Sequence, residues 1–287
     1  MHEFWTQPER AVALFSLLDT VFPGIAQAAE RIRGLGVSWE GASTPFVFEE
    51  AGAALAHVGL IELPLVLEGR ETVVGSVHAV ATCADQRGRG LYRAVMTRLL
   101  AWCESRFSTL VLTTEHPEYF TPFGFRHCPE AAFRLAVDHA GPREPLRLLE
   151  LSQPQDLALL HRLLSTREPL SHRLGVVREQ AIFCFNMGRQ DLWYSQALDA
   201  LCCFERQGTG LRLLDLVTPR LPAWPQLLAC LPGPLDEIIF EFSPDRLAPQ
   251  VLPQPRLLDH DGPSWLMVRG PWLPEGTPFT LPIPART

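Results

Sequence analysis

The most constraining feature of this sequence is a strand, a glycine-containing turn and an amphipathic helix that follow one another between residues 72 and 102. Residues 72–82 are mostly apolar and rich in valine, which predicts a strand. Residues 83–90 contain two glycines and two arginines, and residues 91–102 repeat apolar side chains at helical spacing. Glycines let the backbone approach an anion closely, and the first N–H groups of the helix then point at that anion. The segment therefore predicts an anion site, for which a pyrophosphate is the natural ligand.

The turn differs from two common phosphate-binding motifs. A P-loop is excluded because no Gly-Lys-Ser or Gly-Lys-Thr follows the glycines. The dinucleotide fingerprint is excluded because Gly88-x-Gly90 lacks the third glycine, and Arg93 stands in its place. The pyrophosphate is therefore expected to belong to another class of cofactor.

Residues 86–91, Gln-Arg-Gly-Arg-Gly-Leu, resemble the acetyl-coenzyme A loop of the GNAT acyltransferases, which reads Gln/Arg-x-x-Gly-x-Gly/Ala. Tyr92 replaces the final small residue, a change common in the branch that resembles the enhanced intracellular survival acetyltransferases. Residues 109–113 form the apolar strand expected next, and residues 118–126 look like the family's closing Tyr-x-x-x-Gly-Phe motif. The resemblance covers residues 45–137, and it rests on all these motifs occurring in the right order.

The resemblance implies an acetyl-coenzyme A site on these segments. The main chain of the turn would hold the pyrophosphate, and the free edge of the preceding strand would bind the pantetheine arm, with one strand N–H on the thioester oxygen. The cofactor-binding residues implied in this way are Val80, Ala81, Thr82, Arg87, Gly88, Arg89, Gly90, Leu91 and Tyr92.

The proton donor is the place where this sequence departs from the family. The family's tyrosine stands four residues before the glycine of the Gly-Phe pair, and this chain has Phe120 there, which carries no acidic proton. The adjacent Tyr119 is the candidate donor to the leaving thiolate. The alternatives are that another donor or water serves, that the activity is weak, or that Tyr119 only stacks at the domain edge.

Four residues are candidates for the general base: Glu62, His78, Glu115 and His116. Glu115 and His116 follow the strand at 109–113, near the expected thioester, and with Tyr119 they form the predicted catalytic set. His78 shares a strand face with Val80 and Thr82, and it is either a base or a buried, hydrogen-bonded histidine. Glu62 lies in an apolar strand, where burial would raise its pKa, or it is an exposed strand residue.

Composition and charge limit the class of protein. All 25 basic residues are arginine, and the net charge is −7. The negative net charge argues against non-specific nucleic-acid binding and is compatible with an amine substrate. Seven cysteines without a Cys-x-x-Cys pair predict reduced thiols, and neither they nor the histidines have the spacing of a metal site. No apolar run is long enough to cross a bilayer and no secretory signal is visible, so we expect a cytoplasmic protein.

The element order predicts two similar domains. Helices at 8–22 and 24–33, strands at 46–48, 54–67 and 72–82, and then the turn, helix and strand give the layout of a GNAT domain. The fold class is therefore α/β (α+β), a mixed and mostly antiparallel sheet flanked by helices. A linker near residues 138–145 separates the predicted catalytic domain, 1–140, from a second domain, 146–287.

The second domain is predicted to repeat the first in element order. The pattern predicts a strand at 147–151, helices at 156–164 and 177–187, strands at 191–196, 199–206 and 211–217, a helix at 224–231 and a strand at 236–242. The loop equivalent to the anion turn, residues 217–225, has no glycine and three prolines, which lack an N–H. We expect a degenerate GNAT-like domain without a cofactor that serves packing or substrate recognition, with Trp265 packed in it.

These features predict an acyl-coenzyme A-dependent N-acyltransferase, with acetyl as the expected group and direct attack by an amine in a ternary complex. The acceptor, a small-molecule or peptide amine, would lie in the cleft between the two halves. A non-catalytic acyl-coenzyme A-binding or regulatory module is the alternative that Phe120 raises, and a nucleotide-binding protein of another class is a third.

Overall fold

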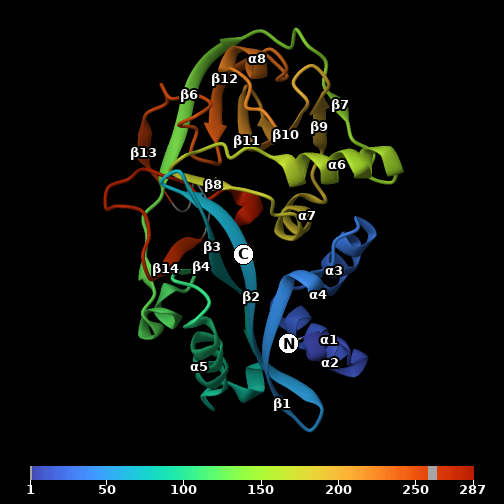
Figure 1. Ribbon diagram of the computed structural model, residues 1–287, viewed down its shortest axis with the longest axis vertical. Helices are drawn as coiled ribbons and strands as arrows, with labels where there is room; N and C mark the ends of the chain where they lie inside the picture. The colour runs from blue at the N-terminus through green and yellow to red at the C-terminus, as the bar shows by residue number, and fades with distance from the viewer. Residues whose placement is uncertain (1, 258–263) are drawn as a thin grey trace.

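The computed structural model describes residues 2–257 and 264–287, which form two seven-stranded sheets with helices packed on them (Figure 1). The first sheet contains β1 (Ser43–Glu50), β2 (Ala53–Leu67), β3 (Arg70–Thr82), β4 (Leu110–Thr114), β5 (Arg126–His127), β8 (Leu174–Val176) and β14 (Trp265–Arg269). Its order is β1-β2-β3-β4-β14-β5, and β8 pairs with the last residues of β2, 65–67.

The second sheet lies beyond the first and is built from later parts of the chain. It contains β6 (Ala131–His139), β7 (Arg147–Leu148), β9 (Leu192–Ser195), β10 (Ala200–Gln207), β11 (Gly210–Val217), β12 (Leu235–Phe240) and β13 (Pro253–Pro255). Its order is β13-β6-β12-β11-β10-β9-β7. The predicted mixed, mostly antiparallel α/β class is confirmed, because the described strands pair in parallel only at β3–β4 and at β11–β12.

Helices cover both faces of the first sheet (Figure 1). Those of the first half are α1 (His2–Trp5), α2 (Pro8–Val21), α3 (Ile25–Gly34), α4 (Trp39–Ala42) and α5 (Leu91–Cys103), with short 3-10 turns η1 (Ala84–Gln86), η2 (Pro117–Tyr119) and η3 (Thr121–Phe123). Apolar residues of α2 pack with Val47 and Ala81, whereas those of α5 pack with Val58 and Val77 on the other face. The stripes that make both helices amphipathic thus face the same sheet from opposite sides.

The second half contributes shorter helices. They are α6 (Pro154–Thr166), α7 (Ala181–Met187), α8 (Trp224–Leu228) and the 3-10 turn η4 (Ile283–Ala285). The helix predicted at 177–187 begins too early. Residues 177–180 connect β8 to α7, and the helix begins only at Ala181. The carboxylate of Glu179 accepts the N–H groups of Ile182 and Phe183, at 2.6 and 2.9 Å, and so satisfies two free donors at the start of α7.

Each sheet contains at least one strand from the other half of the chain, β8 and β14 in the first sheet and β6 in the second. β14 lies between β4 and β5 in the first sheet, while β6, which directly follows the first half, lies between β12 and β13 in the second. The expectation that Trp265 packs the second domain is therefore wrong, since β14 places it opposite Thr114, with its ring edge-on to His127 at 4.5 Å. The predicted domains, 1–140 and 146–287, each take a strand from the other, and the division stays a prediction.

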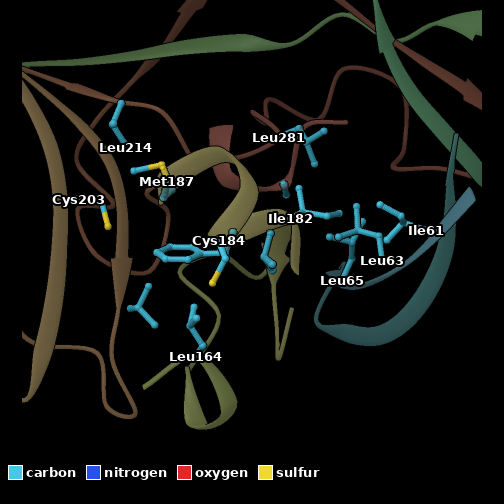
Figure 2. Close-up of a cluster of buried hydrophobic side chains, with 14 of the residues drawn as sticks. Ile61, Leu63, Leu65, Leu164, Ile182, Cys184, Met187, Cys203, Leu214 and Leu281 are labelled. Atoms are coloured by element: carbon cyan, nitrogen blue, oxygen red, sulfur yellow. The ribbon is translucent and has the colours of Figure 1, made fainter. Parts of the chain in front are cut away.

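One hydrophobic cluster joins the two halves, and α7 lies at its centre (Figure 2). It contains Ile61, Leu63 and Leu65 of β2, Ile182 and Met187 of α7, and Cys203 and Leu214 of the second sheet. Each buried side chain of this kind contributes about 1.5–3 kcal/mol to folding. Separating the halves would therefore expose a large apolar surface.

Two further predictions concern thiols and membranes. All seven cysteines are free, and five of them are buried, as predicted for reduced thiols. Within the described residues, no helix combines the length and the apolar character needed to cross a membrane. In the same part of the chain, no three His, Cys, Asp or Glu side chains gather closely enough to hold a metal ion. The location of the protein in the cell stays a prediction.

Candidate active site

The turn between β3 and α5 has the geometry of an anion site. Gly88 and Gly90 have φ angles of 82° and 78°, which are left-handed values that favour glycine. No atom lies within 4 Å of the point where a Cβ would stand at either glycine, so this side of the turn is open. Among the described residues, the N–H groups of residues 88–93 have no acceptor, whereas the N–H of Ala94 is bonded to the carbonyl of Gly90. The start of α5 therefore presents a row of unbonded N–H donors, which fits a pyrophosphate.

The two arginines of the turn differ in their partners. The guanidinium of Arg89 is hydrogen-bonded to Gln86 and lies 3.2 Å from the carboxylate of Glu50. The side chain of Arg87 forms no hydrogen bond or ion pair within the described ranges, so its charge is uncompensated. Because the Arg89–Glu50 pair is exposed to solvent, it is worth at most about 1 kcal/mol and leaves Arg89 free to rearrange toward an anion.

Tyr92 connects this turn to the segment that follows β4. Its hydroxyl donates a hydrogen bond to the carbonyl of Tyr119 at 3.1 Å, and its ring meets Phe120 and Phe123 edge-on. Burial raises the pKa of the Tyr92 hydroxyl, which therefore stays protonated and keeps donating. The large residue at this position thus fixes the first turn of α5 against the segment that carries Tyr119.

β3 and β4 diverge after a short parallel contact. Of the described residues, only 75–76 of β3 pair with 110–111 of β4, so the edge of β3 at residues 77–82 has no strand beside it. Ala79 has φ +48°, a left-handed value that is uncommon for a residue with a Cβ, and the register between β2 and β3 shifts in the same region. The predicted pantetheine contacts at residues 80–82 therefore follow a bulge and lie on an unpaired strand edge.

Thr287 lies where β3 and β4 begin to separate, on the face of β3 away from α5. Its hydroxyl is 2.6 Å from the hydroxyl of Ser76, and its main-chain oxygen accepts a hydrogen bond from Thr113 at 2.5 Å. Asn186 of α7 donates to the carbonyls of residues 283, 284 and 286, at 2.9–3.4 Å. The segment 283–287 is thus held between α7 and the divergence. Sequence reasoning did not find it, because no local motif marks it.

A buried pair of polar side chains lies on the same face. Nε2 of His78 is 2.9 Å from Oγ of Ser43, and the edge of the His78 ring meets Trp39 at 4.8 Å. A Cβ at Gly59 would stand 2.4 Å from Nε2, so the absence of a side chain at Gly59 makes room for the imidazole. Of the two interpretations of His78, the buried, hydrogen-bonded histidine is confirmed. Ser43 was not predicted as a site residue, because no pattern near it indicates a histidine partner.

His57 and His78 are both neutral near pH 7. Burial lowers the pKa of His78 well below its usual value, and the nearby His57 lowers it further. Burial lowers the pKa of His57 to about 4, although a hydrogen bond from its Nδ1 to the carbonyl of Ala79, at 2.7 Å, opposes this. In the described structure, Nε2 of His57 and Nδ1 of His78 have no hydrogen-bond partner.

These low pKa values predict a loss of stability in mild acid. The unfolded chain binds a proton on His57 near pH 6.5, whereas the folded chain does so only near pH 4, so the free energy of unfolding falls as the pH drops from 6.5 to 4. We expect His57 to contribute about 3 kcal/mol to this fall, and the variant His57→Leu to lose that part of the slope. Urea unfolding between pH 4 and 7.5 measures it. The exposed His116→Gln should keep the wild-type slope, and an unchanged slope in His57→Leu would contradict the assignment.

The predicted catalytic residues Glu115, His116 and Tyr119 lie together on the exposed segment after β4. The rings of His116 and Tyr119 are 5.2 Å apart, Nδ1 of His116 is 3.2 Å from the carboxylate of Glu118, and Tyr119 is 57% exposed. Phe120, by contrast, is buried beside α5. The three residues are therefore on the α5 side of the site, just after β4, where β3 and β4 have separated.

A cavity of about 560 Å³ opens between the two halves of the chain. Its walls come from α4, β1, β2 and β3 and from residues 178–181, and they include Ser43, which is 4% exposed. Three carboxylates line it: Glu40, Glu62 and Glu179. Arg178 also lines the cavity, and its guanidinium forms an ion pair with Glu71. Glu62 is an exposed strand residue, which decides between its two interpretations. Because Glu40 is paired with Arg33 and Glu179 accepts N–H groups of α7, Glu62 supplies the negative charge that faces the cavity.

The equivalent loop in the second half is filled by its own side chains. Between β11 and α8, the N–H of Leu221 is bonded to the carboxylate of Glu168 at 2.9 Å, and the hydroxyl of Thr218 donates to the carbonyl of Arg220. The anionic side chain of Glu168 thus occupies one donor that a phosphate would need. That the second half holds no pyrophosphate stays a prediction.

Comparison with known proteins agrees with this geometry. A family model described as an acetyltransferase (GNAT) domain matches residues 6–128. The fold is similar to a probable N-acyltransferase of unknown function from Enterococcus faecalis V583, with TM-score 0.58 and 15% identity over 90% of this chain and 69% of that one. It is also similar to Eis1 from Mycobacterium abscessus, with TM-score 0.54 and 17% identity over 91% and 70% of the two chains.

A GCN5-related N-acetyltransferase from Anabaena variabilis gives TM-score 0.54 and 14% identity, over 88% of this chain and 68% of that one. At these identities the similarity shows the fold, which is the predicted GNAT fold. No curated protein matches the chain in sequence.

Proposed function

We propose that this chain, whose residues 6–128 match a family model described as an acetyltransferase (GNAT) domain, transfers an acyl group from acyl-coenzyme A to an amine. The match to that model supports acyl transfer as the class of reaction. The acetyl group, the amine acceptor and direct attack in a ternary complex are the finer parts of the proposal. The observation that carries it is the row of unbonded N–H groups at residues 88–93, directly beyond the unpaired edge of β3.

The proposed cofactor site uses the residues predicted from the sequence. The N–H groups of residues 88–92, with Arg87 and Arg89, would hold the pyrophosphate of acetyl-coenzyme A, and residues 80–82 would bind its pantetheine arm. When bound, the cofactor supplies the thioester whose carbonyl carbon is the electrophile. A main-chain N–H on the β3 edge would stabilise the negative charge that develops on the carbonyl oxygen.

The predicted catalytic residues have a consistent place in this proposal. Tyr119 lies on the side of α5, from which the cofactor would extend, and is proposed to donate a proton to the leaving thiolate. Glu115 and His116 remain the proposed general bases, and the contact of the His116 ring with the Tyr119 ring supports a shared role for them.

The acceptor amine is proposed to enter through the cavity between the halves. Residues 178–181 of the second half form one wall, so the second half would serve substrate recognition without binding a cofactor. The carboxylate of Glu62, which faces the cavity, favours a cationic amine over an anion.

A thermal-shift series tests the proposal. Acetyl-coenzyme A and free coenzyme A should raise the melting temperature, whereas ATP and NAD should not, because a ligand that binds the native state stabilises it. Release of free thiol is then measured with acetyl-coenzyme A and spermidine, an aminoglycoside, phenethylamine and a peptide with a free amino terminus. Binding without thiol release for any amine supports the non-catalytic module, and stabilisation by ATP or NAD instead would contradict the cofactor assignment.

A further inference from the structure

The buried side chain of His57 holds the main chain of β3 at the point where its pairing with β2 becomes irregular. Nδ1 of His57 lies 2.7 Å from the carbonyl oxygen of Ala79, and the side chain is 1% exposed. The pairing of the two strands sets His57 opposite Ala81, and the register shifts between residues 57 and 59. A side chain of β2 thus bonds a carbonyl at the bulge of β3.

The hydrogen of this bond comes from the imidazole. A carbonyl oxygen accepts and never donates, and a neutral imidazole has one N–H and one bare nitrogen. The ring proton of His57 is therefore on Nδ1, and the bare Nε2 is the atom without a partner in the described structure. Burial lowers the pKa of His57 to about 4, so the ring keeps this tautomer at neutral pH.

This bond also sets the direction of the next main-chain N–H. The peptide between Ala79 and Val80 is trans, and in a trans peptide the C=O and N–H groups point in opposite directions. Because the carbonyl of Ala79 is directed at His57 of β2, the N–H of Val80 points away from that ring. On the side away from β2, the edge of β3 at residues 77–82 has no strand beside it in the described part of the chain.

The two faces of the sheet agree with this direction. His57 lies on the α2 face, because it is paired with Val47 and Ala81, whose side chains pack on α2. A carbonyl that bonds a side chain on this face turns the following N–H toward the opposite face. The opposite face is that of α5, on the side of which the predicted catalytic residues lie.

The backbone at Ala79 needs a contact of this kind to stay in place. Its φ of +48° is a left-handed value, which is unfavourable for a residue with a Cβ. Such a conformation persists only where its surroundings hold it. The bond from His57 is one such hold, and it acts on the carbonyl of Ala79 itself.

Resting on the proposed function, we propose that His57 is a positioning residue for the thioester: through the carbonyl of Ala79 it holds the N–H of Val80 in the direction from which that N–H donates to the thioester oxygen. Val80 is thereby singled out among the three residues of the proposed thioester-binding edge, 80–82. Since the pyrophosphate would bind at the turn, His57 should affect the acyl end of the cofactor and leave its grip on the phosphates unchanged.

A series of variants at position 57 separates this role from a structural one. Leucine places a carbon where Nδ1 stands, whereas asparagine places an N–H donor at the same number of bonds from the main chain. His57→Leu should lower kcat at least about tenfold, since one donor to such an oxygen is worth about 100-fold, and should leave the thermal shift by free coenzyme A unchanged. His57→Asn should regain a kcat within about threefold of wild type.

His139→Leu is the matched control. His139 is a buried histidine of the second sheet, and its Nε2 lies 2.9 Å from the carbonyl oxygen of Leu231, so the same kind of bond is removed away from the proposed site. This variant should keep the wild-type kcat. Equal kcat values in His57→Leu and wild type would overturn the proposal, and so would an equal loss of kcat in His57→Leu and His57→Asn.

Two readouts do not depend on turnover. Long-range proton–nitrogen NMR of the wild type at pH 7, with the His57 signals assigned by their loss in His57→Asn, should show the ring proton on Nδ1. Acetyl-coenzyme A labelled with carbon-13 at the thioester carbonyl and bound without an amine should absorb in the infrared at a lower frequency in wild type and His57→Asn than in His57→Leu, because a hydrogen bond weakens the C=O bond.

A ring proton on Nε2, or one carbonyl frequency in all three proteins, would overturn the proposal. If His57→Leu does not fold, His57→Gln takes its place, because its N–H lies one bond further from the main chain than Nδ1 does.

These outcomes differ from those that would contradict the proposed function. If wild type binds acetyl-coenzyme A but acylates no amine, acyl transfer fails, and the infrared series still decides the role of His57. If wild type acylates an amine and His57→Leu does so with unchanged kcat, only the assignment of His57 fails.

Discussion

Replacement of both Arg87 and Arg89 by glutamate is expected to abolish the thermal shift by coenzyme A. The change turns two positive side chains at the turn into negative ones, so the pyrophosphate would meet repulsion in front of the N–H groups of residues 88–93. Wild type with coenzyme A at about 100 times its Kd should gain about 2.7 kcal/mol, or a shift of about 5 °C. Differential scanning fluorimetry at low and physiological salt measures the loss.

A matched control changes the net charge equally at a distance from the site. Arg70 and Arg143 are exposed and have no side-chain partner among the described residues, so Arg70→Glu with Arg143→Glu should keep the shift. Without ligand, both double variants should melt within about 2 °C of wild type, because exposed pairs such as Arg89–Glu50 contribute little. A full shift in the Arg87→Glu, Arg89→Glu variant would contradict the placement of the pyrophosphate.

The fragment of residues 1–142 is expected not to fold by itself. It lacks β14, which pairs with β4 over residues 110–114, and it contains β6, whose partners β12 and β13 are in the other half. The fragment would also expose Ile61, Leu63 and Leu65, which pack against α7 in the complete chain. Circular dichroism and hydrogen exchange of the purified fragment should show no cooperative unfolding and little protection.

A cleavable linker gives the complementary measurement. Residues 142–145 are exposed, so a protease site inserted there should be cut in the folded protein. The two pieces should remain together in size-exclusion chromatography and still bind coenzyme A, because each sheet holds a strand of the other piece. A fragment of residues 1–142 that folds and binds coenzyme A alone would show that β14 is dispensable.

The conformation of the turn proposed to bind the cofactor was predictable because it is local in sequence. Glycines at 88 and 90 are required by positive φ angles, and the helix that follows supplies the donors, so a few adjacent residues specify the whole turn. Local periodicity predicted most helices and hairpins for the same reason.

The residues on the side where the acceptor amine would bind are brought together by contacts between distant parts of the chain. Ser43 and His78 are 35 positions apart, and the cavity wall at residues 178–181 comes from the other half of the chain. β14 and the segment 283–287 contact the first sheet although they follow most of the second sheet in the chain. Which sheet an apolar strand joins depends on the free energy of the complete core, because short apolar segments such as β6 and β14 fit either sheet equally well by their own pattern. The sequence alone thus determined the conformation of the turn proposed to bind an anion, whereas only the tertiary structure decided which residues lie opposite it.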